Sequence, residues 1–278
     1  ITGKLSEFAP RAKFIHIDID PAEISKNVPA HIPIVGDAKQ VLPKLSKEYR
    51  ALQTDSGRLD GWWKQIAAWQ EEYPLRYEDG EGSEIKPQFM IEAMYRATGG
   101  DAIITSDVGQ HQMWCAQYFH FAEPRRWINS GGLGTMGFGL PAAIGAKVAL
   151  PDEQVVCLAG DGSLVMTCQE LATCVHHEIP VKVFLMNNGY MGMVRQWQEL
   201  FWDKRYSSVE MGPSPDWVKL AEAFGATGMR CEESADLEEM MGKALEADGP
   251  VLVDVRVSPE ENCYPMIPAG AAARDMVG

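Results

Sequence analysis

Two short polar turns hold the residues of this sequence that are best suited to chemistry. Gly160-Asp161-Gly162 follows the apolar run VVCLA, and Asn187-Asn188, 24 residues further on, follows the apolar run VKVFLM. Asp161 offers a carboxylate oxygen and Asn188 an amide oxygen, and turn carbonyls can complete the coordination of a hard cation such as Mg²⁺. Gly162 and Ser163 are predicted to open a helix, whose free N–H groups and positive dipole end attract an anion. The pattern therefore predicts a diphosphate that a metal bridges to the protein.

The position of both turns after strand patterns strengthens this prediction. In an open parallel sheet, ligands bind at the edge that the carboxyl ends of the strands form. Either turn alone is typical of an ordinary connection between elements. Two such turns at strand ends, with one helix between them, favour a functional site.

The elements that must position these turns alternate between strand and helix patterns. Apolar runs predict strands over residues 13–20, 32–35, 102–106, 155–159, 181–186 and 251–257. Helices are predicted over a short stretch ending at Asn27 and over 38–52, 59–73, 87–98, the later part of 131–150, 167–176, 191–202, 216–224 and 235–247. The alternation predicts an α/β fold with a parallel sheet and helices on both faces.

A break in this pattern divides the chain. The acidic, glycine-containing stretch from Tyr77 to Glu84 has the composition of a linker. We therefore predict residues 1–76 as the end of one domain, 77–85 as a linker and 86–278 as a second domain. The first 76 residues hold too few strands to bury a sheet, and the chain begins Ile1-Thr2-Gly3 without a methionine. We therefore expect it to be cut from a longer protein.

The composition disfavours several classes of function. Of the 278 residues, 46% are hydrophobic and 23% charged, as in an average globular protein. The 39 acidic and 25 basic residues give a net charge of −14, which argues against nucleic acid or an anionic membrane as a partner. No apolar run approaches the roughly 20 residues of a membrane span, and no signal-peptide pattern opens the chain. The six cysteines form no C-x-x-C pair, which predicts reduced thiols in the cytoplasm.

Longer motifs resemble one enzyme family. The G-D-G-x24-N-N block resembles the signature of thiamine-diphosphate enzymes. The stretches VGQHQMW, SGGLGTMGFGLPAAIGA, GDGS, QELAT, NNGYMGMVRQWQELF and YPMIPAG resemble the C-terminal part of the catalytic subunit of acetohydroxyacid (acetolactate) synthase. The resemblance runs over nearly the whole chain. It implies a parallel-sheet thiamine-diphosphate-binding domain, preceded by the remnant of a Rossmann-like FAD-binding domain.

The resemblance implies roles for individual residues. Asp161 and Asn188 match the side-chain ligands of Mg²⁺, and Tyr190 matches a position that offers its backbone carbonyl. The residues that match contacts with thiamine diphosphate are Gln110, His111, Gly134, Met136, Gly162, Ser163, Met191, Gly192 and Met193. The positions that match the substrate entrance are Val194, Trp197 and Ala269. Family members commonly carry serine at the position of Ala269, so a contact through that hydroxyl is not expected here.

Ordinary structural roles remain open for several of these residues. Gln110 and His111 match a loop that closes on the diphosphate, but a histidine there could equally cap a helix or lie in the core. Met136 matches an apolar wedge beneath the thiazolium ring, or is a core methionine. Val194 and Trp197 could instead form the apolar stripe of an amphipathic helix.

The segment before the linker matches the last elements of the family's FAD-binding domain, with FIHIDIDPAEI and VGDA as the matching stretches. The candidates for contact with the adenosine part of FAD are Asp18, Ile19, Asp37 and Ala38. A carboxylate at the carboxyl end of a strand suits hydrogen bonds to ribose hydroxyls. A solvated aspartate at a strand end is the ordinary alternative. FAD would be structural, because the implied reaction has no net redox change.

The implied reaction is that of acetolactate synthase. The enzyme decarboxylates pyruvate and transfers the hydroxyethyl unit to a second 2-oxo acid, pyruvate or 2-oxobutyrate, in branched-chain amino-acid biosynthesis. Its active site forms between two subunits, which implies a homodimer or larger homo-oligomer, often with a regulatory small subunit. In the family, the glutamate that activates the cofactor lies in an N-terminal domain upstream of the position of Ile1. This chain is therefore expected to hold no catalytic residue and to be inactive alone.

Two other interpretations remain open. One is a related thiamine-diphosphate carboligase, decarboxylase or oxidase, and the other is a catalytically silent fragment that only binds cofactor. The chain also departs from the family at Gly189-Tyr190-Met191, where Gln-His-Leu or a similar trio is usual. Because the third metal contact is a backbone carbonyl, this change is expected to affect the closing of the pocket and not the metal.

Overall fold

The computed structural model divides into two compact units. Unit 1 comprises Ile1–Leu75 and Tyr264–Gly278, and unit 2 comprises Arg76–Cys263. The structure describes residues 3–52, 56–78, 84–213 and 215–278. Most of the acidic core of the predicted linker, residues 79–83, lies outside the described residues. The domain boundaries expected from the sequence therefore stay a prediction, and each unit is described by itself.

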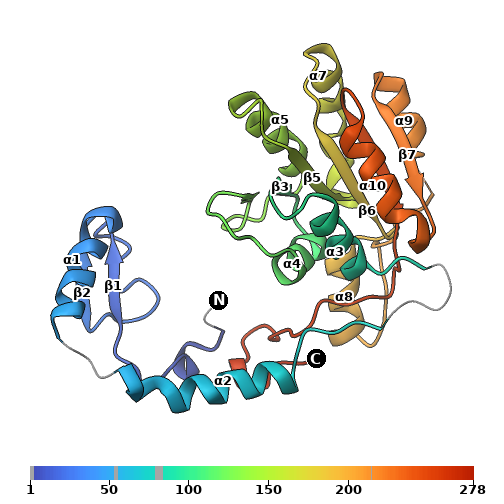
Figure 1. Cartoon of the computed structure of the whole chain (residues 1–278). Coiled ribbons are helices and arrows are strands. Elements are labelled where there is room, and N and C mark those ends of the chain that lie inside the picture. The colour runs from blue at the N-terminus through green and yellow to red at the C-terminus, as the bar shows by residue number, and fades with distance from the viewer. Residues whose placement is uncertain (1–2, 53–55, 79–83, 214) are drawn as a thin grey trace. The chain divides into compact units, whose positions relative to one another are not determined.

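Unit 2 is built on a six-stranded sheet (Figure 1). Every neighbouring pair of strands is parallel, and the order is β4-β3-β5-β6-β8-β7. The strands are β3 (Ile103–Ser106), β4 (Trp127–Asn129), β5 (Val155–Gly160), β6 (Lys182–Asn187), β7 (Thr227–Cys231) and β8 (Val251–Arg256). The prediction of an α/β fold with a parallel sheet is confirmed. The two edge strands β4 and β7 were not predicted, because one has three residues and the other contains Gly228 and Arg230 in place of an apolar run.

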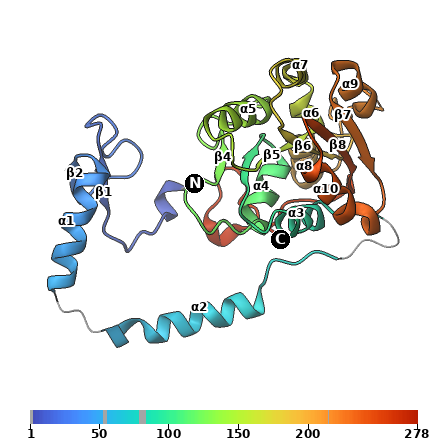
Figure 2. The same ribbon diagram turned by 45° about the horizontal axis from the view of Figure 1, so that its top comes forward.

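Helices cover both faces of this sheet (Figure 2), as the strand alternation requires. On β5, Val156 and Leu158 pack into one core cluster and Cys157 and Ala159 into another. The first cluster is closed by α3 (Pro87–Ala97), α4 (Gln110–Tyr118) and α10 (Leu237–Glu246). The second is closed by α5 (Gly139–Ala149), α7 (Leu171–His176) and α9 (Trp217–Phe224). The prediction of helices on both faces is therefore confirmed.

Two predicted helical features of unit 2 differ in the structure. The helix predicted to open at Gly162 is the single turn α6 (Asp161–Leu164), and the helix predicted from Thr167 begins only at Leu171, after η3 (Cys168–Glu170). The backbone leaves the helical region at Thr167, with φ −139°, and the Thr167 hydroxyl donates to the carbonyl of Gly137 at 3.1 Å. The segment of Gln110 and His111, expected as a loop, forms the first turn of α4.

The remaining elements of unit 2 are α8 (Gly192–Phe201) and η4 (Ser234–Asp236). Unit 1 contains a two-stranded parallel sheet of β1 (Ile15–Asp18) and β2 (Ile32–Val35). Its helical elements are η1 (Leu5–Glu7), α1 (Ala38–Ala51), η2 (Ser56–Leu59), α2 (Asp60–Glu72) and η5 (Ala273–Asp275). The Asp37 side chain caps α1 by accepting a hydrogen bond from the N–H of Lys39 at 2.8 Å.

The short helix predicted to end at Asn27 is absent, since the residues after β1 form separate turns. Ser25 has φ +62°, in the left-handed region, which is incompatible with a continuing right-handed helix. β1 is also shorter than the predicted 13–20, because Asp20 turns back so that its N–H donates to Oδ1 of Asp18 at 2.9 Å. The prediction of a short helix ending at Asn27 was therefore wrong.

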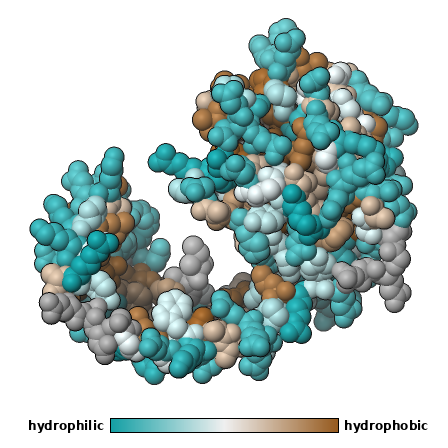
Figure 3. Space-filling view, in the orientation of Figure 1, coloured by the Kyte–Doolittle hydropathy of each residue, from teal (hydrophilic) through white to brown (hydrophobic). Residues whose placement is uncertain are grey.

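Hydrophobic side chains are visible among hydrophilic ones on both units (Figure 3). Three tryptophans of α2 are also exposed, with 55% of Trp62, 62% of Trp63 and 45% of Trp69 accessible to solvent. A search of the described residues finds no helix with the length and apolar character that crossing a membrane requires. All six cysteines are free thiols.

Candidate functional site

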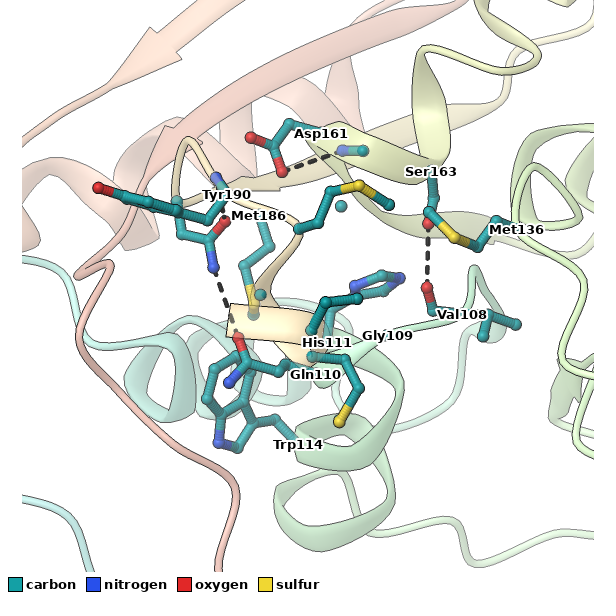
Figure 4. A pocket seen from close by; sticks show the side chains of 17 residues that line it. Val108, Gly109, Gln110, His111, Trp114, Met136, Asp161, Ser163, Met186 and Tyr190 are labelled. Atoms are coloured by element: carbon teal, nitrogen blue, oxygen red, sulfur yellow. Dashed lines mark hydrogen bonds between the residues drawn. The ribbon is translucent and has the colours of Figure 1, made fainter. Parts of the chain in front are cut away.

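The carboxyl ends of β3, β5 and β6 surround an open hollow in unit 2 (Figure 4). From β3 the chain continues to β4, which pairs with one edge of β3. From β4 it crosses to β5, which pairs with the opposite edge of β3. This reversal is a topological switch point, the position at which open α/β sheets bind ligands.

Asp161 follows β5 directly and is 4% exposed. Its Oδ1 accepts a hydrogen bond from the N–H of Gly162 at 3.0 Å, whereas the buried Oδ2 has no hydrogen-bond partner among the described residues. Burial raises the pKa of Asp161 to about 6, although the backbone N–H groups of Gly162, Asp161 and Gly189 and, less strongly, the Arg256 guanidinium oppose this shift. A buried carboxylate oxygen without a protein donor is suited to a cation.

Asn188 follows β6 and lines the same hollow as Asp161. Its Oδ1 accepts a hydrogen bond from the N–H of Tyr190 at 3.0 Å, and its Nδ2 donates to Oε1 of Gln110 at 3.5 Å (Figure 4). Gln110 is held in turn by its own Nε2, which donates to Oε1 of Gln196 at 2.8 Å. A Cβ at Gly192 would collide with Oε1 of Gln110 and lie 2.8 Å from Nδ2 of Asn188. A larger residue at position 192 would therefore displace the side chains of Gln110 and Asn188.

His111 lines the hollow from the first turn of α4 and is 6% exposed. Burial lowers its pKa to about 4, so the imidazole is neutral near pH 7. Its Nε2 has no hydrogen-bond partner within the described part of the chain. A Cβ at Gly160 would lie 2.8 Å from its Nδ1, so the ring packs directly on the backbone of the Gly-Asp-Gly turn. His111 is buried as a core histidine would be, yet it presents an unsatisfied nitrogen at the site.

Asp107, at the end of β3, is a residue that the sequence analysis did not single out. Its carboxylate is fully buried and accepts hydrogen bonds from the N–H groups of Val108, Gly137 and Gly139 at 2.9, 2.8 and 3.2 Å. These bonds tie the glycine-rich segment that carries Met136 to the end of β3. Asp107 therefore holds together two sides of the hollow.

Most of the predicted cofactor-binding residues lie around one hollow. Those that line it are Gln110, His111, Met136, Asp161, Gly162, Ser163, Asn188, Tyr190, Met191, Gly192 and Met193. Val194, which was predicted at the substrate entrance, lines the same hollow. Figure 4 shows Asp161 and Ser163 on one side and His111, Gln110 and Trp114 on the opposite side. Lining residues that were not predicted are Val108, Gly109, Trp114, Gly160 and Met186. The sequence feature that could have identified them is their position near the ends of predicted strands or in the segment that follows β3.

Seven predicted residues do not line this hollow. Gly134 lies in an exposed turn of unit 2, in which its N–H donates to the carbonyl of Ser130 at 2.9 Å. Trp197 lies on α8 with 46% of its surface exposed. The others belong to unit 1 and are Asp18, Ile19, Asp37, Ala38 and Ala269. The proposed roles of these residues stay predictions.

The fold and the site together define a class of protein. A parallel α/β sheet carries carboxylate and amide oxygens and several glycines at its carboxyl edge, as in cofactor-binding α/β domains. Residues 107–255, more than half of the chain, match the description "Thiamine pyrophosphate enzyme, C-terminal TPP binding domain". The chain therefore belongs to the thiamine pyrophosphate (thiamine diphosphate) enzyme family. Residues 1–45 match the central domain of the same family.

Curated relatives point to one branch of this family. The chain is 50% identical over 282 residues to the acetolactate synthase isozyme 3 large subunit of Escherichia coli (strain K12), covering 99% of this chain and 49% of that protein. It is 47% identical over 281 residues to the acetolactate synthase large subunit of Haemophilus influenzae, covering 99% and 48%. For the acetolactate synthase large subunit of Parasynechococcus marenigrum the identity is 47% over 279 residues, covering 100% and 45%. The chain spans about half the length of the curated relatives it matches.

Proposed function

We propose that this chain supplies the thiamine-diphosphate- and Mg²⁺-binding part of an acetolactate synthase. The enzyme would join the two-carbon unit that remains after decarboxylation of pyruvate to a second 2-oxo acid. The similarity to acetolactate synthase large subunits over nearly the whole chain supports this branch of the family. The observation that carries the site is Oδ2 of Asp161, a buried carboxylate oxygen without a donor among the described residues, at the carboxyl edge of the sheet.

The residues present fit a divalent cation that carries a diphosphate. Asp161 and Asn188 would offer side-chain oxygens, and Tyr190 a backbone carbonyl. Gly192 leaves room at the turn, because a Cβ there would strike Gln110. A negatively charged protein needs such a local attraction for an anion, since its net charge of −14 repels one.

The chain's own residues would then provide orientation and a dry surrounding. Met136, Met186 and Met191 line the hollow with apolar surface that excludes water around a bound ring. The Ser163 hydroxyl donates to the carbonyl of Val108 at 3.0 Å and so joins the ends of β5 and β3. The neutral His111 keeps one unpaired nitrogen toward the site. Thiamine diphosphate, when bound, supplies the electron sink for the carbanion that decarboxylation produces.

Further parts of the proposal concern the rest of the assembly. FAD would contact Asp18, Ile19, Asp37 and Ala38 in unit 1, although Asp37 also caps α1 there. The 2-oxo acids would enter past Val194, Trp197 and Ala269. Relatives named as large subunits support a homo-oligomer that works with a regulatory small subunit. Flavin fluorescence during titration of the chain with FAD would test the first point.

Isothermal titration calorimetry tests the cofactor site directly. Thiamine diphosphate should bind the chain when Mg²⁺ is present and should not bind in excess chelator. Asp161→Ala should abolish this binding, whereas Asp152→Ala, which removes an exposed carboxylate, should leave it unchanged. Undiminished affinity in Asp161→Ala would contradict the site.

Product analysis with pyruvate, alone and with 2-oxobutyrate, tests the reaction in the assembled enzyme. Formation of 2-acetolactate and 2-aceto-2-hydroxybutyrate is expected. Release of acetaldehyde alone would instead indicate a decarboxylase that uses the same cofactor.

A further inference from the structure

A buried polar cluster lies behind the turn that carries Asn188. Its centre is Asp254 on β8, whose side chain is fully buried. One carboxylate oxygen accepts a hydrogen bond from Nδ2 of Asn187 at 2.7 Å. The other accepts one from Nε of Arg230 at 3.0 Å and lies 3.3 Å from Nε of Arg256. Asp254 therefore joins β6, β7 and β8 at the carboxyl edge of the sheet.

Asn187 connects this cluster to the turn. Its Oδ1 accepts a hydrogen bond from the N–H of Gly189 at 3.2 Å. Because the carboxylate of Asp254 has only acceptors, it can pair with the Nδ2 of Asn187 but not with its oxygen. The amide oxygen is therefore always turned toward Gly189. The next residue of the turn is held in the same way, because the N–H of Tyr190 donates to Oδ1 of Asn188. This second hydrogen bond forms in a turn whose backbone is already fixed at Gly189.

We propose that Asp254 is a positioning residue for the metal site. It fixes the orientation of the Asn187 amide, and thereby the backbone path that presents the Asn188 side chain and the Tyr190 carbonyl to the cation. This inference rests on the proposed function, which assigns Mg²⁺ and a diphosphate to this turn. Groups behind metal ligands typically change metal affinity about 10- to 100-fold when they are removed.

The substitution Asp254→Asn perturbs this arrangement without changing its size. The new side chain has one acceptor and one donor group where the carboxylate had two acceptors. The cationic Arg230 and Arg256 attract the amide oxygen, so the NH₂ group faces Asn187. Asn187 must then rotate its oxygen toward residue 254, and its own NH₂ group meets the N–H of Gly189. The hydrogen bond that fixes the turn is lost.

A second substitution should restore it. In the Asp254→Asn background, Asn187→Asp supplies two acceptor oxygens, one for the amide at position 254 and one for the N–H of Gly189. Asn187→Asp alone places a second carboxylate against that of Asp254. In the unaltered chain, Nδ2 of Asn187 lies 2.7 Å from Oδ1 of Asp254. Each single variant should therefore lose affinity, and the double variant should recover most of it. A residue that only neutralises Arg230 would not show this reciprocal rescue.

The experiment titrates Mn²⁺, followed by its electron paramagnetic resonance signal, into the 278-residue chain with thiamine diphosphate present. The unaltered chain should bind, Asp254→Asn should bind about 10- to 100-fold more weakly, and Asp254→Asn/Asn187→Asp should approach the unaltered chain. Asp216→Asn is the matched control. Asp216 is the other partner of Arg230, at 2.8 Å, and among the described residues it pairs with Arg230 and Lys219 and not with the turn, so its loss should leave the affinity unchanged.

Equal affinity in Asp254→Asn, or a double variant no better than the single ones, would overturn the inference and leave Asp254 as a counter-ion of the arginines. Failure of the unaltered chain to bind Mn²⁺ with thiamine diphosphate would overturn the proposed function and this inference with it. If circular dichroism shows Asp254→Asn unfolded, the comparison of Asn187→Asp with the double variant still decides between the two outcomes.

Discussion

Asp161→Asn should change how the stability of the metal-free protein depends on pH. Burial raises the pKa of Asp161 from 3.8 to about 6, so the folded state keeps a proton that the unfolded chain has already released. The stability that this protonated form contributes is present at low pH and is lost as the pH rises through about 6. Asparagine cannot titrate, so the variant should lack this loss.

The size of the effect follows from the two pKa values. A shift from 3.8 to about 6 disfavours the ionised folded state by about 3 kcal/mol at pH 8. Part of this loss is already present at pH 4, so the free energy of unfolding of the unaltered chain should fall by about 2 kcal/mol between pH 4 and pH 8, relative to the variant. The amide introduces an unpaired NH₂ group that costs about 1–3 kcal/mol. This cost is the same at both pH values and cancels in the comparison.

Urea denaturation followed by circular dichroism measures both proteins at the two pH values. At pH 8, thiamine diphosphate with Mg²⁺ at 100 times its dissociation constant should stabilise the unaltered chain by about 2.7 kcal/mol and leave Asp161→Asn unchanged. Asp107→Asn is the control, because the Asp107 carboxylate already accepts three backbone hydrogen bonds. It should destabilise the protein at both pH values. Parallel pH curves for Asp161→Asn and the unaltered chain, with equal stabilisation by the cofactor, would contradict the assignment of Asp161.

Three other predictions test the surroundings of the site. Gly192→Ala should weaken thiamine diphosphate binding in calorimetry and cost about 1–3 kcal/mol in urea denaturation, because its Cβ collides with Gln110; undiminished binding would show that Gln110 can move aside. Burial lowers the pKa of His111 from 6.5 to about 4, so the unfolded chain takes up a proton that the folded protein refuses, and the folded state becomes less stable as the pH falls. Between pH 7 and pH 5 the free energy of unfolding of the unaltered chain should therefore fall by about 2 kcal/mol relative to His111→Gln. An identical pH dependence of the two proteins would argue against a neutral, buried imidazole. Phe184→Ala on β6 should reduce the free energy of unfolding by about 3–5 kcal/mol, since the ring is fully buried between strands and helices, whereas Trp63→Ala on the exposed face of α2 should change it little.

The sequence predicted the central strands well because their burial on both faces makes them continuous apolar runs. β5, β6 and β8 are buried at nearly every position, and their patterns were visible without the structure. The edge strands β4 and β7 are half-buried and short, so their sequences carry little of this signal. The helix α4 was missed for a related reason. Its apolar residues Trp114 and Cys115 are buried, but Gln110 and His111 in its first turn are polar and buried too, which removes the amphipathic pattern.

The candidate site was predictable where its residues stand at the ends of recognisable strands. The turns at Asp161 and Asn188 follow such strands, and the structure brings both to one hollow. Contacts between distant segments were not predictable, because no periodicity encodes them. The bond from Gln110 to Gln196 spans 86 positions, and the bond from Asp107 to Gly137 spans 30. The seven predicted residues outside the hollow came from motif similarity alone.

Three buried aspartates lie in strands of this sheet or directly after them, and the hydrogen-bond and ion-pair partners around each differ. Asp107 accepts three backbone hydrogen bonds, and Asp254 is held by Asn187, Arg230 and Arg256. Both carboxylates are satisfied by the protein itself, so their buried charge serves the architecture. Asp161 has one donor for one oxygen and none for the other among the described residues. A protein tolerates such a buried oxygen when something outside the chain completes it. We therefore propose that the unsatisfied carboxylate of Asp161 contacts the ligand and that Asp107 and Asp254 hold the surrounding backbone in place.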